Sequence, residues 1–338
     1  MKIGIIGCGA ITCFRHAPEC ESNPDIEIAG FFDLVENRAR ELAERYGGRV
    51  YKTYEDMLDD KNVDGVIVCT SNSTHAEVTI KSLQAGKHVL CEKPLATIIE
   101  DGIAMDKAAN DADRLLMIAQ NQRMDAAHIK AKEIIKSGVL GDVIFFRSEF
   151  SHSGPENWGV DKTKNSWFFN KNAAILGAMG DLGVHKIDLM RWMLEEEFVN
   201  VSAIVGSFDK KAPDGGPISV DDNAICLLST ESGIVGTVTA SWSNYGIVDN
   251  STRIYCTNGV IKINEAPQYG VEIAWKNGEN VLYKLPTQTR SGIVDAFVDA
   301  VANGNASPIS AGDAVKTLKV IFAALTASEN GNTVSIEY

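Results

Sequence analysis

The sequence predicts two domains: a doubly wound parallel α/β domain, followed by an α+β domain with a large, mainly antiparallel open sheet. Two observations indicate this division. As far as about Gln120, short apolar runs alternate with helix-like stretches, which is typical of a parallel sheet covered by helices on both faces. Beyond that point the runs become longer and alternate between apolar and polar residues, as antiparallel strands do.

The first domain is expected over residues 1–121, with five apolar runs as strands and four periodic stretches as helices between them. The strands are expected at Ile3–Ile6, Ile26–Phe32, Val63–Cys69, Val89–Cys91 and Leu115–Ala119. The helices are expected at Ile11–Cys20, Val35–Tyr46, Thr74–Ala85 and Glu100–Ala109.

The second domain is expected over residues 122–338, where turn signals such as Thr257-Asn258-Gly259 separate the strands. The strands are expected at Val143–Ser151, Val199–Phe208, Asn223–Thr230, Ile234–Ser241, Thr252–Cys256, Val260–Ile263, Val271–Trp275 and Val281–Leu285. Helices are expected at Met124–Ser137, Asp181–Leu194, Ile293–Ala302 and Asp313–Glu329, the last two packing back at the domain interface. The run Ala224–Leu228 is apolar throughout, which predicts burial on both faces of its strand.

Composition excludes several classes of function. Hydrophobic residues make up 45% of the 338 residues and charged residues 23%, as in ordinary globular proteins. A net charge of −13 leaves no general basic footprint for nucleic acid or an anionic membrane. The apolar run at the N-terminus is too short for a secretory signal, so we expect a cytoplasmic protein. Seven cysteines without a Cys-x-x-Cys motif argue against a disulfide framework and a zinc ribbon, and no metal is expected.

A glycine turn follows the first strand directly. Gly7-Cys8-Gly9 allows a tight turn whose backbone N–H groups meet a pyrophosphate at the helix N-terminus, where Ala10, Ile11 and Thr12 follow. Thr12 replaces the usual third small residue, and its hydroxyl could contact a phosphate. A Gly-x-Gly alone fits a plain βα turn equally well, but its position at the start of a parallel α/β domain favours a Rossmann dinucleotide site.

Asp33 ends the second strand. A carboxylate there can accept hydrogen bonds from the ribose hydroxyls of NAD and would repel the 2′-phosphate of NADP. We therefore expect NAD to be preferred, with NADP possible. Asp33 also fits the N-cap of the helix that follows, and the two roles are compatible.

Three further segments complete a recognisable set: Thr70-Ser71-Asn72-Ser73-Thr74-His75, Glu92-Lys93-Pro94, and Asp181-Leu182-Gly183-Val184-His185-Lys186-Ile187-Asp188. Together with the glycine turn, and in this order, they resemble the glucose–fructose oxidoreductase/inositol dehydrogenase family (Gfo/Idh/MocA) over essentially the full chain. The segment Ala173–Gly180 departs from the family's small-residue run before the aspartate, which leaves the sugar specificity open.

The resemblance implies roles for particular residues. Lys93, Asp181 and His185 would be catalytic and would bind the substrate. The cofactor would be approached by Thr70, Ser71, Asn72, His75, Glu92, Lys93 and Gln122. Arg123 would line the substrate side, and Trp167 could stack on a sugar face, although core packing fits Trp167 at least as well.

Oxidation of a secondary alcohol needs a base for the hydroxyl proton and a hydride acceptor beside the carbon. His185 suits the base because an unperturbed imidazole has a pKa of about 6.5. Lys93 can stabilise the developing alkoxide, and Asp181, one helical turn from His185, can orient the imidazole or bind a neighbouring hydroxyl. The competing interpretation is a polar helix stripe facing solvent, an N-cap at Asp181 and an exposed loop lysine.

The expected function is an NAD(P)-dependent oxidoreductase that transfers a hydride between nicotinamide and a hydroxyl carbon of a sugar, cyclitol or sugar derivative. Two alternatives stay open: glycoside cleavage or epimerisation by transient oxidation with bound NAD, and a dinucleotide-binding regulator without catalysis. The resemblance also implies a homodimer or homotetramer assembled through the sheet of the second domain.

Overall fold

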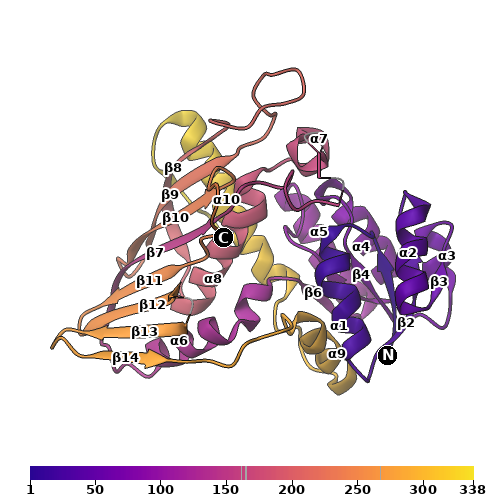
Figure 1. Cartoon of the computed structure of the whole chain (residues 1–338), viewed down its shortest axis with the longest axis horizontal. Helices are drawn as coiled ribbons and strands as arrows, with labels where there is room; N and C mark the ends of the chain where they lie inside the picture. The colour runs from indigo at the N-terminus through magenta and orange to yellow at the C-terminus, as the bar shows by residue number, and fades with distance from the viewer. Residues whose placement is uncertain (161, 164–165, 267) are drawn as a thin grey trace.

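The computed structural model describes residues 1–160, 162–163, 166–266 and 268–338. It contains two sheets, each in its own domain, which lie side by side (Figure 1). The predicted fold class is confirmed: a parallel six-stranded sheet comes first, and a mixed, mostly antiparallel nine-stranded sheet follows.

The first sheet has the strand order β3-β2-β1-β4-β5-β6, and all its pairs are parallel. Its strands are β1 (Lys2–Ile6), β2 (Glu27–Phe32), β3 (Arg49–Val50), β4 (Gly65–Val68), β5 (His88–Cys91) and β6 (Leu116–Ile118). The chain winds outward in one direction from β1 and in the other from β4. Ligands of such sheets bind at this reversal, beyond the carboxyl ends of the strands.

The helices of this domain follow the expected runs with two differences. They are η1 (Thr12–His16), α1 (Ala17–Ser22), α2 (Glu36–Tyr46), α3 (Tyr54–Asp59), η2 (Asn72–Thr74), α4 (His75–Gln84), α5 (Ile99–Ala112) and η3 (Asn121–Met124). The first expected helix divides into a π-helical turn, η1, and α1. The strand β3 and the helix α3, which begins at a capping box between Thr53 and Asp56, were not expected.

The second sheet has the order β14-β13-β12-β11-β7-β10-β9-β8-β15. Its strands are β7 (Val143–Ser151), β8 (Phe198–Gly206), β9 (Asn223–Thr230), β10 (Val235–Ser241), β11 (Thr252–Cys256), β12 (Gly259–Ala266), β13 (Tyr269–Trp275), β14 (Asn280–Tyr283) and β15 (Val334–Ser335). β10 and β7 pair in parallel and their neighbours pair antiparallel.

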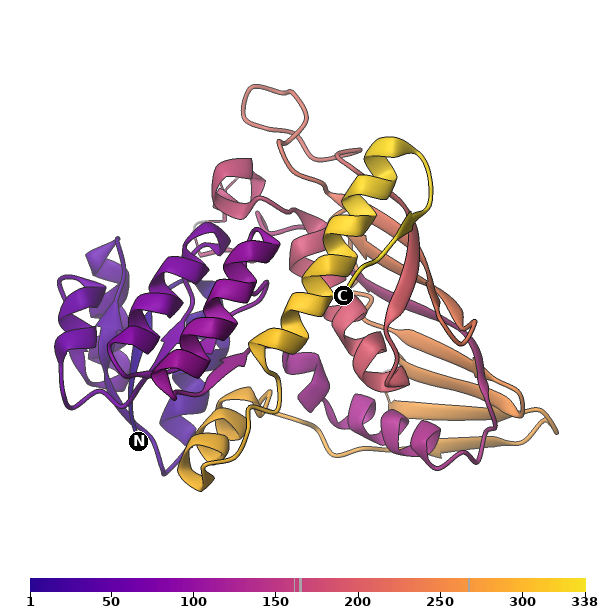
Figure 2. The ribbon, with the colours of Figure 1, turned by 180° about the vertical axis from the view of Figure 1, so that it is seen from behind.

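The helices of the second half lie between this sheet and the first domain (Figure 2). They are α6 (Ala126–Lys136), η4 (Trp167–Phe169), α7 (Lys171–Ala174), η5 (Met179–Gly183), α8 (Val184–Leu194), α9 (Ile293–Asn303) and α10 (Ala311–Asn330). α10 contacts both β8 and α5, and α9 contacts α1 and β5, so the C-terminal helices pack against both domains.

The opposite face of the second sheet is exposed in this chain. Ile204 is 64% exposed, Ile225 55% and Leu227 54%. Helices cover only the face of β9 that carries Ala224, Cys226 and Leu228, so burial of its other face stays a prediction that requires another subunit.

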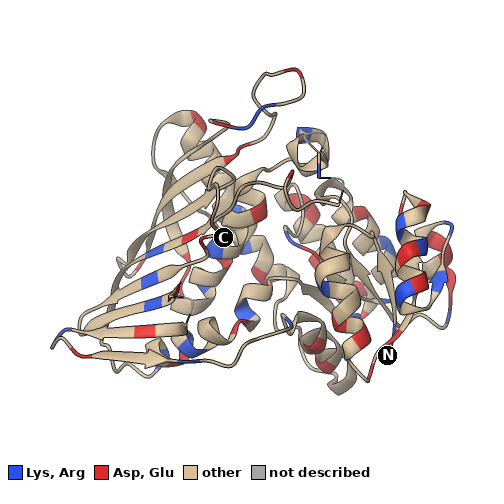
Figure 3. Ribbon diagram, viewed as in Figure 1, with Lys and Arg blue, Asp and Glu red and all other residues tan. Residues whose placement is uncertain are grey.

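Charged residues of both signs are spread over both domains (Figure 3). Within the described residues, no helix is long and apolar enough to cross a membrane. The same part of the chain holds no group of three His, Cys, Asp or Glu residues that could bind a metal ion. All seven cysteines carry free thiols.

Candidate active site

The glycine turn has the backbone that a close ligand requires. Gly7 has a φ of +98°, and a Cβ there would lie 2.4 Å from the carbonyl oxygen of Cys69, so only glycine fits. A Cβ at Gly9 would meet no atom within 4 Å. The open side of the turn lies beside Ala10 and Ile11, where the first helix begins, and therefore fits a pyrophosphate.

The hydroxyl of Thr12 has a different role from the expected phosphate contact. Its Oγ1 is part of a fully buried side chain and donates to the carbonyl oxygen of Gly7 at 2.6 Å. Thr12 thus stabilises the glycine turn through this hydrogen bond, and its hydroxyl points into the protein.

Asp33 is fixed at the end of β2 by two backbone N–H groups. Its Oδ2 accepts from Cys8 N and its Oδ1 from Val35 N, both at 2.7 Å. The N-cap of α2 is Val35, so Asp33 is not the helix cap. The next residue, Leu34, is 94% exposed. A fixed carboxylate beside an exposed apolar side chain fits the ribose and adenine of a dinucleotide.

Two loops at the carboxyl ends of β4 and β5 are tied together. The Nδ1 atom of His75 lies 2.8 Å from the carbonyl oxygen of Pro94, and its Nε2 lies 3.2 Å from that of Thr70. Asn72 donates from Nδ2 to the carbonyl oxygen of Ala174 in the second domain at 3.0 Å. The side chains of Asn72 and His75 thus join loops and domains, and the cofactor contacts expected of them stay predictions. Thr70 and Ser71 belong to the loop whose backbone oxygens accept these bonds: His75 contacts that of Thr70, and Thr74 that of Ser71.

Lys93 and Asp181 form an ion pair across the two domains. The Nζ atom of Lys93 lies 2.8 Å from Oδ1 of Asp181 and 2.8 Å from its backbone oxygen. Trp242 donates from Nε1 to Oδ2 of the same carboxylate at 3.1 Å. Burial alone would raise the pKa of the Asp181 carboxyl, but the charge of Lys93 holds it below its usual range. An ammonium has three N–H groups, so one remains for a substrate oxygen.

His185 lies in the next turn, on α8, and is 6% exposed. Its ring packs against Phe150 with 5.8 Å between the ring centroids. Burial, together with the charges of Lys93 and Arg15, holds the pKa of His185 well below its ordinary value. The imidazole is therefore neutral at neutral pH, which is the form that a base needs.

The expected orienting contact from Asp181 to His185 is not the one the structure contains. Both carboxylate oxygens of Asp181 are bonded to Lys93 and Trp242, and Nδ1 of His185 has no partner among the described residues. Asp181 thus orients the lysine and not the imidazole. The solvent-facing helix stripe is also excluded, because Asp181, His185 and Asp188 are all buried.

Glu92 joins the first helical turn to the catalytic loop through a contact that was not anticipated. Its Oε1 lies 2.7 Å from Nε2 of His16, and its Oε2 accepts from the backbone N–H of Lys93 at 3.1 Å. Burial opposes ionisation, but the hydrogen bond and the charge of His16 lower the pKa of Glu92 to about 2. This pair fixes the backbone of Lys93 relative to the glycine turn.

Arg123 is buried and paired with carboxylates of the protein. Its guanidinium binds the buried carboxylate of Asp188 through two hydrogen bonds, at 2.7 and 2.6 Å, and also pairs with Asp313. This ion-pair network joins η3, α8 and α10, and the substrate contact expected of Arg123 stays a prediction. The neighbouring Gln122 is buried and donates from Nε2 to Oδ1 of Asn250 at 3.0 Å.

An aromatic cluster flanks Asp181. Trp167 is 37% exposed and stacks on Phe168 with 3.9 Å between centroids, and Phe168 packs edge-on against Trp158 and Trp242. Trp167 therefore forms the exposed border of a packed cluster.

His152 lies beside the same carboxylate. Its Nδ1 accepts from Gly154 N at 3.0 Å, so its proton is on Nε2, which lies 3.8 Å from Oδ2 of Asp181. Neither Trp242 nor His152 has a local sequence signal, because each reaches Asp181 only through the fold.

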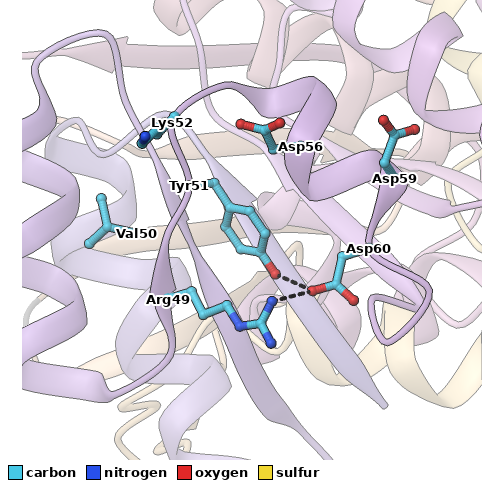
Figure 4. A pocket seen from close by; sticks show the side chains of 7 residues that line it. All are labelled: Arg49, Val50, Tyr51, Lys52, Asp56, Asp59 and Asp60. Atoms are coloured by element: carbon cyan, nitrogen blue, oxygen red, sulfur yellow. Dashed lines mark hydrogen bonds and ion pairs between the residues drawn. The ribbon is translucent and has the colours of Figure 1, made fainter.

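A shallow hollow elsewhere in the first domain is separate from this site. It is lined by residues 49–52 and by Asp56, Asp59 and Asp60 (Figure 4). Asp60 accepts from Arg49 at 3.0 Å and from Tyr51 at 2.9 Å, so these three side chains are paired with one another.

Comparison with protein families gives matches in both domains. A family model described as the oxidoreductase family with NAD-binding Rossmann fold matches residues 1–120, and one described as the GFO/IDH/MocA C-terminal domain matches residues 128–262. The chain belongs to the Gfo/Idh/MocA family of oxidoreductases. The resemblance that the motifs indicate is thereby confirmed.

Relatives in this family are distant but cover most or all of the chain. Levoglucosan dehydrogenase of Pseudarthrobacter phenanthrenivorans is 31% identical over 71% of this chain and 66% of its own length. Myo-inositol 2-dehydrogenase of Thermotoga maritima is 27% identical over 100% of this chain and 99% of its own. A solved structure of levoglucosan dehydrogenase in complex with NADH is 25% identical, with a TM-score of 0.86 over 100% of this chain and 99% of that one.

Proposed function

We propose that this Gfo/Idh/MocA protein is an NAD-preferring dehydrogenase that oxidises a hydroxyl carbon of a sugar, cyclitol or sugar derivative. The observation that carries the proposal is the juxtaposition of the Lys93–Asp181 pair with the buried, neutral His185 at the domain interface. A protein that only binds a dinucleotide has no need of such a proton-transfer group.

The roles follow from the geometry. NAD, when bound, supplies the hydride acceptor. Nδ1 of His185 faces the interior, which leaves Nε2 to take the hydroxyl proton of the substrate. The remaining N–H of Lys93 stabilises the alkoxide that develops as this proton leaves. Asp181 holds the ammonium in place. The products are a carbonyl compound, NADH and a proton on His185.

NAD is favoured over NADP because Asp33 stands at the end of β2, where a 2′-phosphate would meet a negative charge. Arg38 lies 4.0 Å from Asp33 and moderates this repulsion. We therefore expect NADP to be used as well, but more slowly than NAD. The residues proposed around the cofactor are those of the glycine turn, Asp33, the Thr70–Ser71 loop and Glu92–Lys93.

A polyhydroxylated substrate fits the polar atoms around Asp181. His152 presents Nε2–H 3.8 Å from the carboxylate, which suits a hydroxyl next to the reacting one. The aromatic cluster ending at Trp167 offers a flat surface for the ring of a sugar or cyclitol. Relatives named as levoglucosan and inositol dehydrogenases support this class without naming the compound.

The decisive experiment follows NADH absorbance with NAD or NADP over a panel of inositols, free sugars and glycosides. A steady rise with one substrate supports a dehydrogenase and names its class. No rise, with NAD bound and glycosides consumed by mass spectrometry, would favour transient oxidation. Binding of NAD without consumption of any compound in the panel would favour the regulator.

A further inference from the structure

A buried carboxylate binds the turn that leads into Asp181. Asp221 lies just before β9 and is buried. Its Oδ1 accepts from the backbone N–H of Gly177 at 2.7 Å, and its Oδ2 accepts from that of Met179 at 2.6 Å. The backbone N–H of Asp181 in turn donates to the carbonyl oxygen of Gly177 at 2.9 Å. The carboxylate of Asp221 is thus one residue contact away from the backbone of Asp181.

The backbone of Asp221 approaches the same turn closely. The N–H of Ala178 donates to the carbonyl oxygen of Asp221 at 2.9 Å. A Cβ on Gly177 would lie 1.7 Å from that oxygen, so only glycine allows the two segments to lie together. Three consecutive N–H groups of the turn, those of residues 177–179, therefore bond to this one residue. These bonds fix the turn relative to the start of β9.

The residue that follows Asp221 is connected to the other side of Asp181. The carbonyl oxygen of Asp222 accepts from the backbone N–H of Trp242 at 2.8 Å, and the indole of Trp242 donates to Oδ2 of Asp181 at 3.1 Å. The carboxylate of Asp222 is itself held by the backbone N–H groups of residues 208–210. Two adjacent residues thus reach Asp181 by two routes: its backbone through the turn, and its carboxylate through the indole.

We propose that Asp221 is a positioning residue: by holding the turn before Asp181, it sets the point at which the carboxylate of Asp181 meets the ammonium of Lys93. The expected effect on turnover rests on the proposed function. The effect on the position of Asp181 does not, because the ion pair and the indole bond are contacts within the protein. The proposal can therefore be tested in a protein without turnover.

The test is the indole N–H resonance of Trp242 in NMR spectra of the full-length protein. The chain has five tryptophans, and Trp242 is assigned by the resonance that disappears in Trp242→Phe. Asp221→Asn keeps the shape of the side chain but places an NH2 group against one of the two backbone N–H groups. We expect the indole proton of Trp242 to move upfield in this variant, because its bond to the carboxylate of Asp181 lengthens. Trp192 on α8 and Trp275 on β13 serve as internal references and should keep their resonances.

The spectra are recorded in mildly alkaline solution. Burial raises the pKa of the Asp221 carboxyl to about 6, and its ionised form is the one that accepts both backbone bonds. Under these conditions the comparison is between a carboxylate and a neutral amide of the same shape.

Two control variants separate this role from a general loss of stability. Ser219 lies on the same segment as Asp221 and accepts from the backbone N–H of Lys171 at 2.9 Å, farther from Asp181 along the chain. Glu19 is another buried carboxylate that accepts a backbone N–H, that of Ser291 at 2.6 Å, but it lies in the first domain. Ser219→Ala and Glu19→Gln should both leave the indole resonance of Trp242 unchanged.

Kinetics then connect the position of Asp181 to turnover. With an active substrate, kcat of Asp221→Asn should fall by about 10- to 100-fold, because misplacing a catalytic group by about 1 Å can cost about 10²-fold. The affinity for NAD, measured by calorimetric titration, should change by less than about threefold, since the glycine turn and Asp33 lie elsewhere. A merely structural defect would lower both quantities.

An unchanged indole resonance in a folded Asp221→Asn protein would overturn the proposal, as would a shifted resonance with an unchanged kcat. If this variant does not fold, Asp221→Ser takes its place, since the shorter side chain leaves space for water beside the two N–H groups. Failure of both variants to fold would assign Asp221 to folding alone and would equally overturn the proposal. Absence of turnover with every substrate counts against the proposed function alone, because the indole resonance is measured without substrate.

Discussion

At the scale of single residues, the proposed acid–base chemistry is divided between Lys93, which is partly exposed, and His185, which is buried. Lys93 is paired with Asp181, whereas His185 is neutral and has no carboxylate partner among the described residues. This differs from a carboxylate–imidazole pair, in which the anion would favour the protonated ring. Here the surrounding cations favour the neutral ring, which suits proton abstraction.

Replacing the proposed base should affect turnover and leave cofactor binding intact. For His185→Ala we expect kcat to fall by about 10² to 10⁴, because that is the usual contribution of a positioned general base. The affinity for NAD should change by less than about threefold, since the glycine turn and Asp33 lie elsewhere. Steady-state kinetics and calorimetric titration with NAD check the two parts. Equal losses in both would show that His185 supports the site structurally.

The charge at Asp33 should set the cofactor preference. In Asp33→Ala, kcat/KM with NAD is expected to fall by roughly tenfold or more, because the ribose hydroxyls lose their acceptor. The value with NADP should rise or stay constant, since the repulsion of the 2′-phosphate is removed and Arg38 is nearby. The ratio of the two kcat/KM values measures the effect. A ratio unchanged from wild type would remove Asp33 from the cofactor site.

At the scale of elements, the positions of most strands and helices could be predicted from the sequence, but several short ones, among them β3, α3, α7 and β15, could not. β3 has two residues, Arg49 and Val50, which is too few to show a periodicity. α3 spans six residues, and its only clear signal was the capping box between Thr53 and Asp56. Short elements depend on their neighbours, here β2, more than on their own pattern.

The residues of the site likewise divide into those with a local sequence pattern and those that depend on distant neighbours. Lys93, Asp181 and His185 lie in segments with a recognisable order, and the fold brings the first two into contact. Trp242 and His16 could not be assigned, because their partners Asp181 and Glu92 are 61 and 76 residues away in the chain. The ion pairs of Arg123 could not be predicted for a related reason: the sequence does not show that two carboxylates from distant helices meet its guanidinium.

The buried ion pair of Arg123 should matter more for stability than an exposed one. Arg123→Met leaves the carboxylate of Asp188 buried without its bidentate partner. We expect the free energy of unfolding to fall by about 3–5 kcal/mol, the usual cost of breaking a buried pair. Urea denaturation followed by circular dichroism measures this loss.

Two further variants make the stability test specific. Arg40→Met removes the exposed helical pair with Glu36 and should cost less than about 1 kcal/mol. The double variant Arg123→Met/Asp188→Leu removes both charges and should regain most of the lost stability. A loss for Arg123→Met as small as that for Arg40→Met would show that water or Arg191 compensates the unpaired carboxylate of Asp188.

At the scale of the whole molecule, the second sheet is covered by helices on one face only (Figures 1 and 2). On the other face, Ile204 of β8 lies directly opposite Ile225 of the neighbouring strand β9, and Leu227 lies on the same side of β9. Farther along this sheet, the rings of Phe145 and Tyr255 stack with 3.9 Å between centroids. Single exposed apolar residues are ordinary, but a row that crosses adjacent strands is typical of a surface that another subunit covers.

We therefore predict that the protein is a homodimer or homotetramer assembled through this face. The double variant Ile225→Lys/Leu227→Lys places two charges at the centre of the surface, so it should shift the protein to a smaller species at micromolar concentration in sedimentation velocity. Ile103→Lys changes an isoleucine that is 52% exposed on α5, away from this sheet, and should leave the assembly unchanged. A wild-type protein that sediments as a monomer would contradict the prediction. An oligomer that persists in the double variant would place the interface on another surface, since two lysines per subunit cannot be buried against their symmetry mates without partners.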